Sequence, residues 1–303
     1  MCRLYYPDSA QVSIVFDTPE YMNTKQAYKH CLNISKNHYE NFPVASWILP
    51  RRMRLPTAAI YAFARRADDF ADEGDLTDEQ RLTELEQLSQ QINDLYAGSD
   101  SSDPVFIALA DAVKRFSLPK ELFLDLIDAF KQDVTKKRYA DFGELMQYCR
   151  RSANPVGRLM LHLYGQTDRI SLGQSDAICS SLQLINFYQD MAQDYTELGR
   201  VYIPQDEIRA SFVNETYFNS RRTDGPMILL MRKQYERAHK LLQGGAPLGK
   251  SLKGRFGFEI RMIIAAASNI LLKLDKETDD LFSRPRLKFS DWLWIFWKAL
   301  RAK

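Results

Sequence analysis

The first residues that could do chemistry are the aspartates of the segment ARRADDFADEGD. Asp68 and Asp72 are four residues apart on one helical face, whereas Asp69 points roughly 100° away from that face. Two carboxylates on one face repel each other unless a cation lies between them, so the segment predicts either a cation site or a solvated acidic helix end. Arg65, three residues before Asp68, either grips phosphate oxygens or forms an intrahelical salt bridge to Asp68 or Asp69.

A second acidic segment, LQLINFYQDMAQDY, places Asn186, Asp190 and Asp194 at successive four-residue steps. Leucine, isoleucine, phenylalanine, tyrosine and methionine surround this stripe, so we expect the helix to be largely buried. Buried carboxylates are costly without partners, and they normally bind a metal or pair with bases. The oxygen ligands favour Mg²⁺, which uses one or two carboxylates together with phosphate and water oxygens. The alternative is a network of ion pairs in the core.

The two acidic segments together predict a site for a diphosphate. Magnesium ions held by two facing helices would neutralise charge as a carbon–oxygen bond breaks and diphosphate leaves. The carbocation left behind needs an apolar pocket that excludes water and offers aromatic faces. We therefore expect both segments to face one cavity. We also expect Asp72→Asn and Asp190→Asn to relieve repulsion in the metal-free protein without loss of stability.

Apolar residues recur at three- and four-residue spacing along most of the chain, which predicts an all-α fold. We expect one helical domain over residues 24–283, an N-terminal extension over 1–23 and a separate basic, aromatic C-terminal helix over 284–303. The predicted helices span Thr24–Lys36, Thr57–Asp72, Asp78–Tyr96, Pro104–Phe116, Lys120–Asp133, Phe142–Tyr164, Ser175–Asp194, Pro226–Leu242, Lys253–Leu274 and Phe289–Leu300.

Composition excludes several classes of function. The 41 basic and 39 acidic residues give a net charge of +2, so no overall field favours nucleic acid. Four scattered cysteines show no metal-binding or disulfide pattern, and the N-terminus lacks the features of a signal peptide, which favours a cytoplasmic protein. The string GGAPLGKS fits the letters GxxxxGK[ST] but interrupts the helical period as a surface loop, and no GxGxxG string is present to indicate a dinucleotide-binding fold.

The C-terminal segment RPRLKFSDWLWIFWKALRAK combines three tryptophans and several aliphatic side chains with six basic residues. Tryptophans at headgroup level and basic residues facing anionic lipid are typical of a helix that lies on a membrane surface. The segment is too short and too charged to span a bilayer. We expect contact with the inner face of the membrane; the alternative is a terminal helix packed onto the domain.

These motifs resemble the squalene/phytoene synthase family over nearly the whole chain. The strings DDFAD and NFYQDMAQD are similar to the two metal-binding aspartate motifs of that family and occur in the same order. The resemblance implies an isoprenoid synthase-type helical bundle with a central active-site cavity. It assigns metal binding to Asp68, Asp72, Asn186, Asp190 and Asp194.

The same resemblance extends to residues that contact the substrate. AIYAFARRADD, NHYENF, YCRRSANPVG and GRVYIP are similar to family segments that bind diphosphate or steer the cation. The implied substrate-binding residues are His38, Asn41, Tyr61, Arg65, Gln183, Asn186 and Arg200. Tyr148 is implied to act on the rearranging cation, and Arg65 and His38 to assist the leaving group.

Within the family, ENFPVASWILPRRMR and CRRSANPVGRL are most similar to the bacterial hydroxysqualene synthases. That branch implies conversion of presqualene diphosphate and water to hydroxysqualene in squalene and hopanoid biosynthesis, with Mg²⁺ and without NADPH. The enzymatic alternative is head-to-head condensation of prenyl diphosphates to presqualene diphosphate, squalene or phytoene. An alternative of another class is a non-catalytic protein that binds a prenyl diphosphate or assembles a membrane complex.

Overall fold

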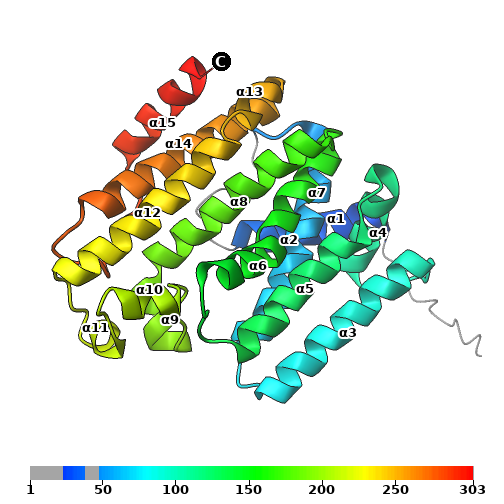
Figure 1. Ribbon diagram of the computed structural model, residues 1–303. Coiled ribbons are helices and arrows are strands. Elements are labelled where there is room, and N and C mark those ends of the chain that lie inside the picture. The colour runs from blue at the N-terminus through cyan, green and yellow to red at the C-terminus, as the bar shows by residue number, and fades with distance from the viewer. Residues whose placement is uncertain (1–22, 38–47, 303) are drawn as a thin grey trace, which may run out of the picture.

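The computed structural model of the chain describes residues 23–37 and 48–302. Within these ranges the chain forms fifteen α-helices and no β-strand, so the predicted all-α fold is confirmed (Figure 1). The helices are α1 (Thr24–Asn37), α2 (Arg51–Asp72), α3 (Asp78–Ala97), α4 (Pro104–Phe116), α5 (Lys120–Thr135), α6 (Phe142–Ser152), α7 (Asn154–Tyr164), α8 (Arg169–Gln189), α9 (Met191–Leu198), α10 (Gln205–Ala210), α11 (Glu215–Asn219), α12 (Gly225–Gly245), α13 (Leu248–Ser251), α14 (Gly254–Lys276) and α15 (Phe289–Arg301).

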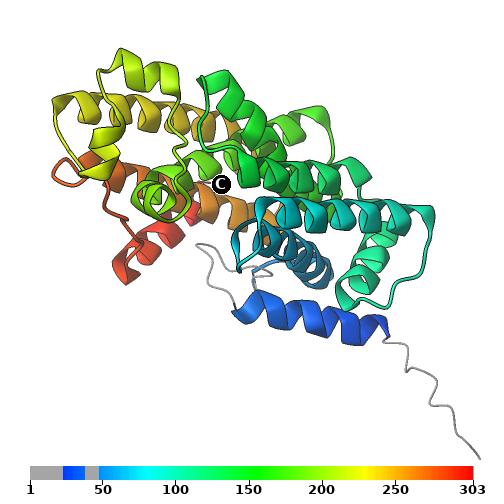
Figure 2. The same ribbon diagram turned by 90° about the horizontal axis from the view of Figure 1, so that it is seen from below.

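Two long helices, α2 and α8, each lie at the centre of one half of the molecule. α2 packs against α1, α3, α4, α5 and α7, whereas α8 packs against α6, α7, α12 and α14. α7 therefore contacts both central helices, and one large cluster of buried apolar side chains extends through both halves. Figure 2 shows α1 along the outer edge of the first half and α15 beside α14 at the other edge.

Two of the predicted helices are interrupted. The predicted helix Phe142–Tyr164 is divided into α6 and α7 at Ala153, because Pro155 has no backbone N–H to continue the helical hydrogen-bond ladder. The predicted helix Ser175–Asp194 begins earlier, at Arg169, and is divided into α8 and α9 at Asp190. The short helices α10, α11 and α13 were not predicted, since four to six residues carry too little periodicity to detect.

The C-terminal helix α15 packs on α14 through one face only. Ile295 and Ala299 of α15 are fully buried, and Ile295 contacts Ala265 and Ala266 of α14. None of the helices in the described ranges combines the length and the apolar character needed to cross a bilayer.

Candidate active site

The first acidic segment forms the C-terminal end of α2. Arg65 forms ion pairs with the neighbouring carboxylates. Its Nη1 lies 3.2 Å from Asp68 Oδ2 and its Nε lies 2.6 Å from Asp69 Oδ1, and it also pairs with Glu73. The intrahelical salt bridge expected as one reading of this segment is therefore present. Asp72, the last residue of α2, is not part of this group.

The second acidic segment spans the junction of α8 and α9. Asp190 has φ of −99° and ψ of 8°, which ends α8, yet the helical bonds from Asp190 N–H to Asn186 carbonyl (2.9 Å) and from Asp194 N–H to Asp190 carbonyl (2.8 Å) persist. The four-residue spacing of the three side chains is thus kept through a bend. Arg284, from the segment that precedes α15, donates to Asp190 Oδ2 at 3.0 Å.

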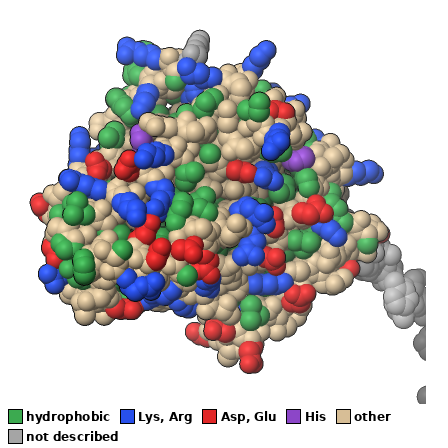
Figure 3. Space-filling view, viewed as in Figure 1, with side chains coloured by type: hydrophobic (Ala, Val, Ile, Leu, Met, Phe, Trp, Pro, Cys, Tyr) green, Lys and Arg blue, Asp and Glu red, His purple; other side chains and the backbone are tan. Residues whose placement is uncertain are grey.

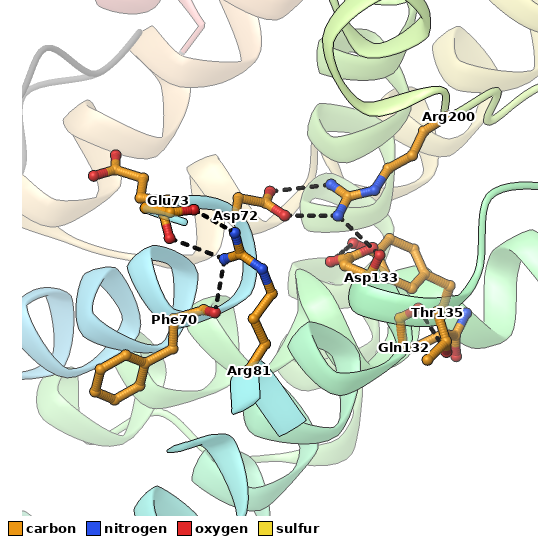
Figure 4. Close-up of polar contacts among 10 residues, drawn as sticks. Phe70, Asp72, Glu73, Arg81, Gln132, Asp133, Thr135 and Arg200 are labelled. Carbon is orange, nitrogen blue, oxygen red and sulfur yellow. Dashed lines mark hydrogen bonds and ion pairs between the residues drawn. The ribbon is translucent and has the colours of Figure 1, made fainter. Parts of the chain in front are cut away.

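Arg200 connects the two acidic segments. Gly199 has φ of +63°, a left-handed conformation that glycine adopts readily, and it turns the chain at the end of α9. The Val201 N–H then donates to the Lys137 carbonyl at 3.0 Å, which ties this loop to the segment after α5. The buried Arg200 side chain donates to both oxygens of Asp72, at 2.6 and 3.0 Å (Figure 4).

Burial and mutual repulsion raise the pKa values of two carboxyl groups in this region, those of Asp194 and Asp133. Burial, followed by the charge of Asp190, raises the pKa of Asp194 to about 7, and Asp72 also contributes to that rise. Burial likewise raises the pKa of Asp133 to about 7, with further contributions from Asp72 and Asp68. Since these groups influence one another, the two acidic segments and α5 border a common region. On the face of the molecule seen in Figure 3, acidic and basic side chains are interspersed rather than separated by sign.

The oxygen donors of the two segments suit Mg²⁺ rather than a softer metal. Carboxylate and amide oxygens are the ligands that this hard cation prefers, and the mutual repulsion felt by Asp194 is what a cation would relieve. Among the described residues, however, no three His, Cys, Asp or Glu side chains converge into a preformed metal site. A magnesium ion needs only one or two carboxylates when substrate phosphate supplies other ligands, so the donors present fit it.

An apolar cavity of about 300 Å³ lies between α2, α7, α8 and α14. Its lining includes Tyr61 on α2, Leu182 on α8 and Ile260 on α14. Asp68 follows Tyr61 by seven residues on the same face of α2, and Asp190, at the C-terminal end of α8, follows Leu182 by eight residues. Because a helix rises 1.5 Å per residue, the acids lie roughly 10–12 Å along their helices from the cavity-lining residues.

Tyr148 belongs to a buried cluster of four aromatic rings. Phe187 and Tyr202 stack with centroids 3.6 Å apart, Tyr148 lies 6.0 and 5.9 Å from these two rings, and Tyr139 lies 5.5 Å from Tyr148. The Tyr148 hydroxyl donates to Asp133 Oδ2 at 2.7 Å. The cluster combines electron-rich ring faces with a carboxylate, an arrangement suited to positive charge.

The structure brings together most, but not all, of the residues singled out from the sequence. Gln183 and Asn186 lie on α8 between the cavity and Asp190, with Gln183 half-buried and Asn186 exposed. His38 and Asn41 lie outside the described residues. Sequence reasoning missed Asp133, although an acidic residue three positions after Phe130 interrupts the apolar stripe of α5 and is a detectable signal.

Comparison with known proteins identifies the family. The squalene/phytoene synthase profile matches residues 35–292. A hydroxysqualene synthase of Rhodopseudomonas palustris is 37% identical over 259 residues, 85% of this chain and 87% of that protein. A phytoene synthase of Mycobacterium tuberculosis is 36% identical over 184 residues, 61% of this chain and 59% of its own length.

A solved structure agrees with these sequence matches. The crystal structure of squalene synthase HpnC from Alicyclobacillus acidocaldarius superposes with a TM-score of 0.79 at 30% identity, covering 85% of this chain and 96% of that one. The fold is therefore that of the squalene synthase-like isoprenoid synthases. The profile match and the relatives together show that the chain belongs to the squalene/phytoene synthase family.

Proposed function

We propose that this chain is a magnesium-dependent hydroxysqualene synthase that converts presqualene diphosphate and water to hydroxysqualene and diphosphate. One observation carries the proposal. α2 and α8 both line an apolar cavity, and each helix ends at an acidic segment, with the two segments bordering one region. A substrate with a long hydrocarbon and a diphosphate matches both ends of this arrangement. The hydroxysqualene synthase relative, similar over most of both chains, supports this branch.

Each part of the site has a role in this reaction. Asp68, Asp72, Asn186, Asp190 and Asp194 would hold the metal. Bound magnesium supplies positive charge to the phosphate oxygens as the carbon–oxygen bond breaks. Arg65 and Arg200, which pair with aspartates in this structure, can transfer their hydrogen bonds to the diphosphate.

The apolar end of the site would protect and stabilise the carbocation. The apolar lining around Tyr61 excludes water while the cation rearranges, and the four-ring cluster around Tyr148 offers aromatic faces to positive charge. We assign His38 and Asn41 to diphosphate contacts on the basis of the motif NHYENF alone. Capture of the cation by water requires no reductant, so the proposal includes no NADPH.

Product analysis tests this assignment. Purified protein with magnesium should convert presqualene diphosphate to hydroxysqualene equally well with and without NADPH, and in ¹⁸O-labelled water the product hydroxyl should carry the label. An unlabelled alcohol would instead indicate return of a diphosphate oxygen. Formation of presqualene diphosphate, squalene or phytoene from prenyl diphosphates would place the chain in the condensing branch. Tight substrate binding without any turnover would show a non-catalytic binder.

We further propose that α15 docks the protein on a bilayer that contains anionic lipid. The face of α15 opposite Ile295 exposes Phe289 (80%), Leu293 (54%) and Trp297 (59%), which are four residues apart and form one stripe. Phe296 on the same side is also exposed. With Trp294, five large apolar side chains are thus exposed on a helix of thirteen residues.

The charges around this stripe favour lipid over a protein partner. Lys298 and Arg301 of α15 are exposed, and so is Lys288, which immediately precedes the helix. The sole acidic residue of the helix, Asp291, is ion-paired with Lys273 of α14 at 2.5 Å. A positive, aromatic surface without a free acid matches the headgroup region of an anionic leaflet. Since α14 also lines the cavity, docking through α15 would hold one wall of the cavity near the phase that dissolves an apolar product.

A further inference from the structure

A further buried carboxylate, outside both acidic motifs, borders the region between them. Asp133 is near the end of α5 and is 6% exposed. Its Oδ2 accepts a hydrogen bond from the Tyr148 hydroxyl at 2.7 Å, whereas its Oδ1 is buried and makes no hydrogen bond with any described residue. Such a group is expensive to bury, because each unsatisfied charged oxygen loses its hydration without replacement.

The main chain of the same residue holds Arg200. The Asp133 carbonyl accepts from Arg200 Nη2 at 2.8 Å, and that nitrogen also donates to Asp72 Oδ1 at 2.6 Å. Figure 4 shows the Arg200 guanidinium in contact with Asp72 on one side and with Asp133 on the other. Asp133 therefore contacts Tyr148 through its side chain and Arg200 through its backbone carbonyl.

A buried carboxylate with a purely structural role looks different in this protein. Glu207 is 9% exposed and accepts hydrogen bonds from Arg237 and Gln234, each at 2.6 Å, with Lys233 at 3.1 Å. These partners hold its pKa down to about 2 against the effect of burial. Asp133 has no comparable partners on its side chain, and burial raises its pKa. Stability alone does not account for a carboxylate kept in that state.

We propose that Asp133 is a positioning residue for the reaction, which sets the direction of the Tyr148 hydroxyl and the place of Arg200. The inference rests on the proposed function, because Tyr148 and Arg200 act on substrate only in a diphosphate-ionising enzyme. The Tyr148 hydroxyl donates its proton in the hydrogen bond to Asp133, so its oxygen has only lone pairs available for other contacts. Tyr148 therefore meets its surroundings as a hydrogen-bond acceptor and presents its negative end to positive charge.

A double-mutant cycle tests this role. Asp133→Asn keeps the shape of the side chain and removes the charge that orients the phenol, and Tyr148→Phe removes the hydroxyl. We expect each single variant to lower kcat for diphosphate release about 10- to 100-fold, because the Tyr148 hydroxyl is then absent or wrongly oriented. KM and the magnesium requirement should be unchanged. In the Tyr148→Phe background, Asp133→Asn should cause no further loss, because the carboxylate charge acts on the reaction through a hydroxyl that phenylalanine lacks.

Glu207→Gln is the matched control, since Glu207 is a buried carboxylate that contacts neither motif. It should lower the melting temperature and leave kcat unchanged, whereas Asp133→Asn should melt no lower than the parent protein. Multiplicative losses in the double variant, wild-type kcat in Asp133→Asn, or a raised magnesium requirement would each overturn the positioning role. Diphosphate release is measured with whichever substrate the parent protein consumes, so product identity, which tests the proposed function, is determined separately.

Discussion

Aspartates of the same motif have different partners in this protein, and their substitutions should differ accordingly. Asp72 accepts two hydrogen bonds from the buried Arg200, and Asp190 pairs with Arg284. Asp194 has no ion pair with any described residue at hydrogen-bonding distance and instead feels the charge of Asp190. The expectation from the sequence, that Asp72→Asn and Asp190→Asn would be harmless to stability, overlooked these arginines.

Asparagine substitutions should therefore shift stability in opposite directions in the metal-free protein. Asp72→Asn leaves the Arg200 guanidinium without its carboxylate and should cost about 1–3 kcal/mol. Asp194→Asn removes a carboxylate whose pKa is raised to about 7, and should add stability on the order of 1–3 kcal/mol at pH 8. Both variants should lose turnover. Urea unfolding with chelator present measures the two effects.

The pH dependence of the Asp194→Asn effect has a definite sign. An acid whose folded pKa lies above its unfolded value binds more protons in the native state, so its penalty is absent below about pH 4 and grows as pH rises to the folded pKa. The gain from Asp194→Asn should thus vanish near pH 4 and be complete above pH 7. A gain that is independent of pH, or a loss at pH 8, would contradict the burial and repulsion assigned to Asp194.

At the scale of helices, the position of α8 depends on its close crossing with α12. A Cβ built on Gly245 would lie 2.5 Å from the Gln174 carbonyl oxygen and 2.5 Å from Ile178 Cγ1, so only glycine fits there without movement. Ile178 also lines the cavity. The neighbouring Gly244 has nothing within 4 Å of its Cβ position and provides a matched control on the same helix.

Gly245→Ala should lower stability by about 1–3 kcal/mol because it forces α8 and α12 apart. Gly244→Ala should instead be neutral or add up to about 1 kcal/mol, since alanine favours helix over glycine. Denaturant midpoints of the two variants measure this contrast. Turnover should fall in Gly245→Ala alone, because α8 carries the second acidic segment; equal behaviour of the two variants would show that the crossing does not constrain α8.

At the scale of the whole molecule, the exposed stripe of α15 determines how the protein would sit on a membrane. Vesicles of phosphatidylglycerol and phosphatidylethanolamine should bind the protein, and neutral phosphatidylcholine vesicles should bind it less. The double substitution Phe289→Ser and Trp297→Ser should weaken binding at least about tenfold, because two large apolar side chains no longer enter the interface. Vesicle sedimentation measures the affinities.

The control for this experiment replaces Ile170 and Leu229, which are 72% and 68% exposed on α8 and α12, with serine. That variant should bind vesicles as the parent protein does. Equal weakening in both double variants would argue for non-specific adhesion. Self-association that depends on α15, without vesicle binding, would assign the stripe to a second copy of the chain instead.

The sequence alone determined the helical fold class and the spacing of the acidic side chains. Both follow from the geometry of the α-helix, in which residues four apart are neighbours whatever surrounds them. The same local rule gave the salt bridge from Arg65 to Asp68 or Asp69, which the structure contains, as one of two interpretations of that segment. It did not predict the bend at Asp190. The helical hydrogen bonds continue on both sides of that residue, so the spacing of apolar residues is the same as in an unbroken helix.

Only the tertiary structure decided how the distant charges pair. Arg200 and Asp72 are 128 residues apart in the chain, and Arg284 and Asp190 are 94 apart, so no local spacing relates them. Asp133 likewise became a candidate only when α5 was seen to place it beside Tyr148 and Arg200. The physical reason is that periodicity is a property of a single helix, whereas the partner of a buried charge is chosen by the packing of several helices against one another.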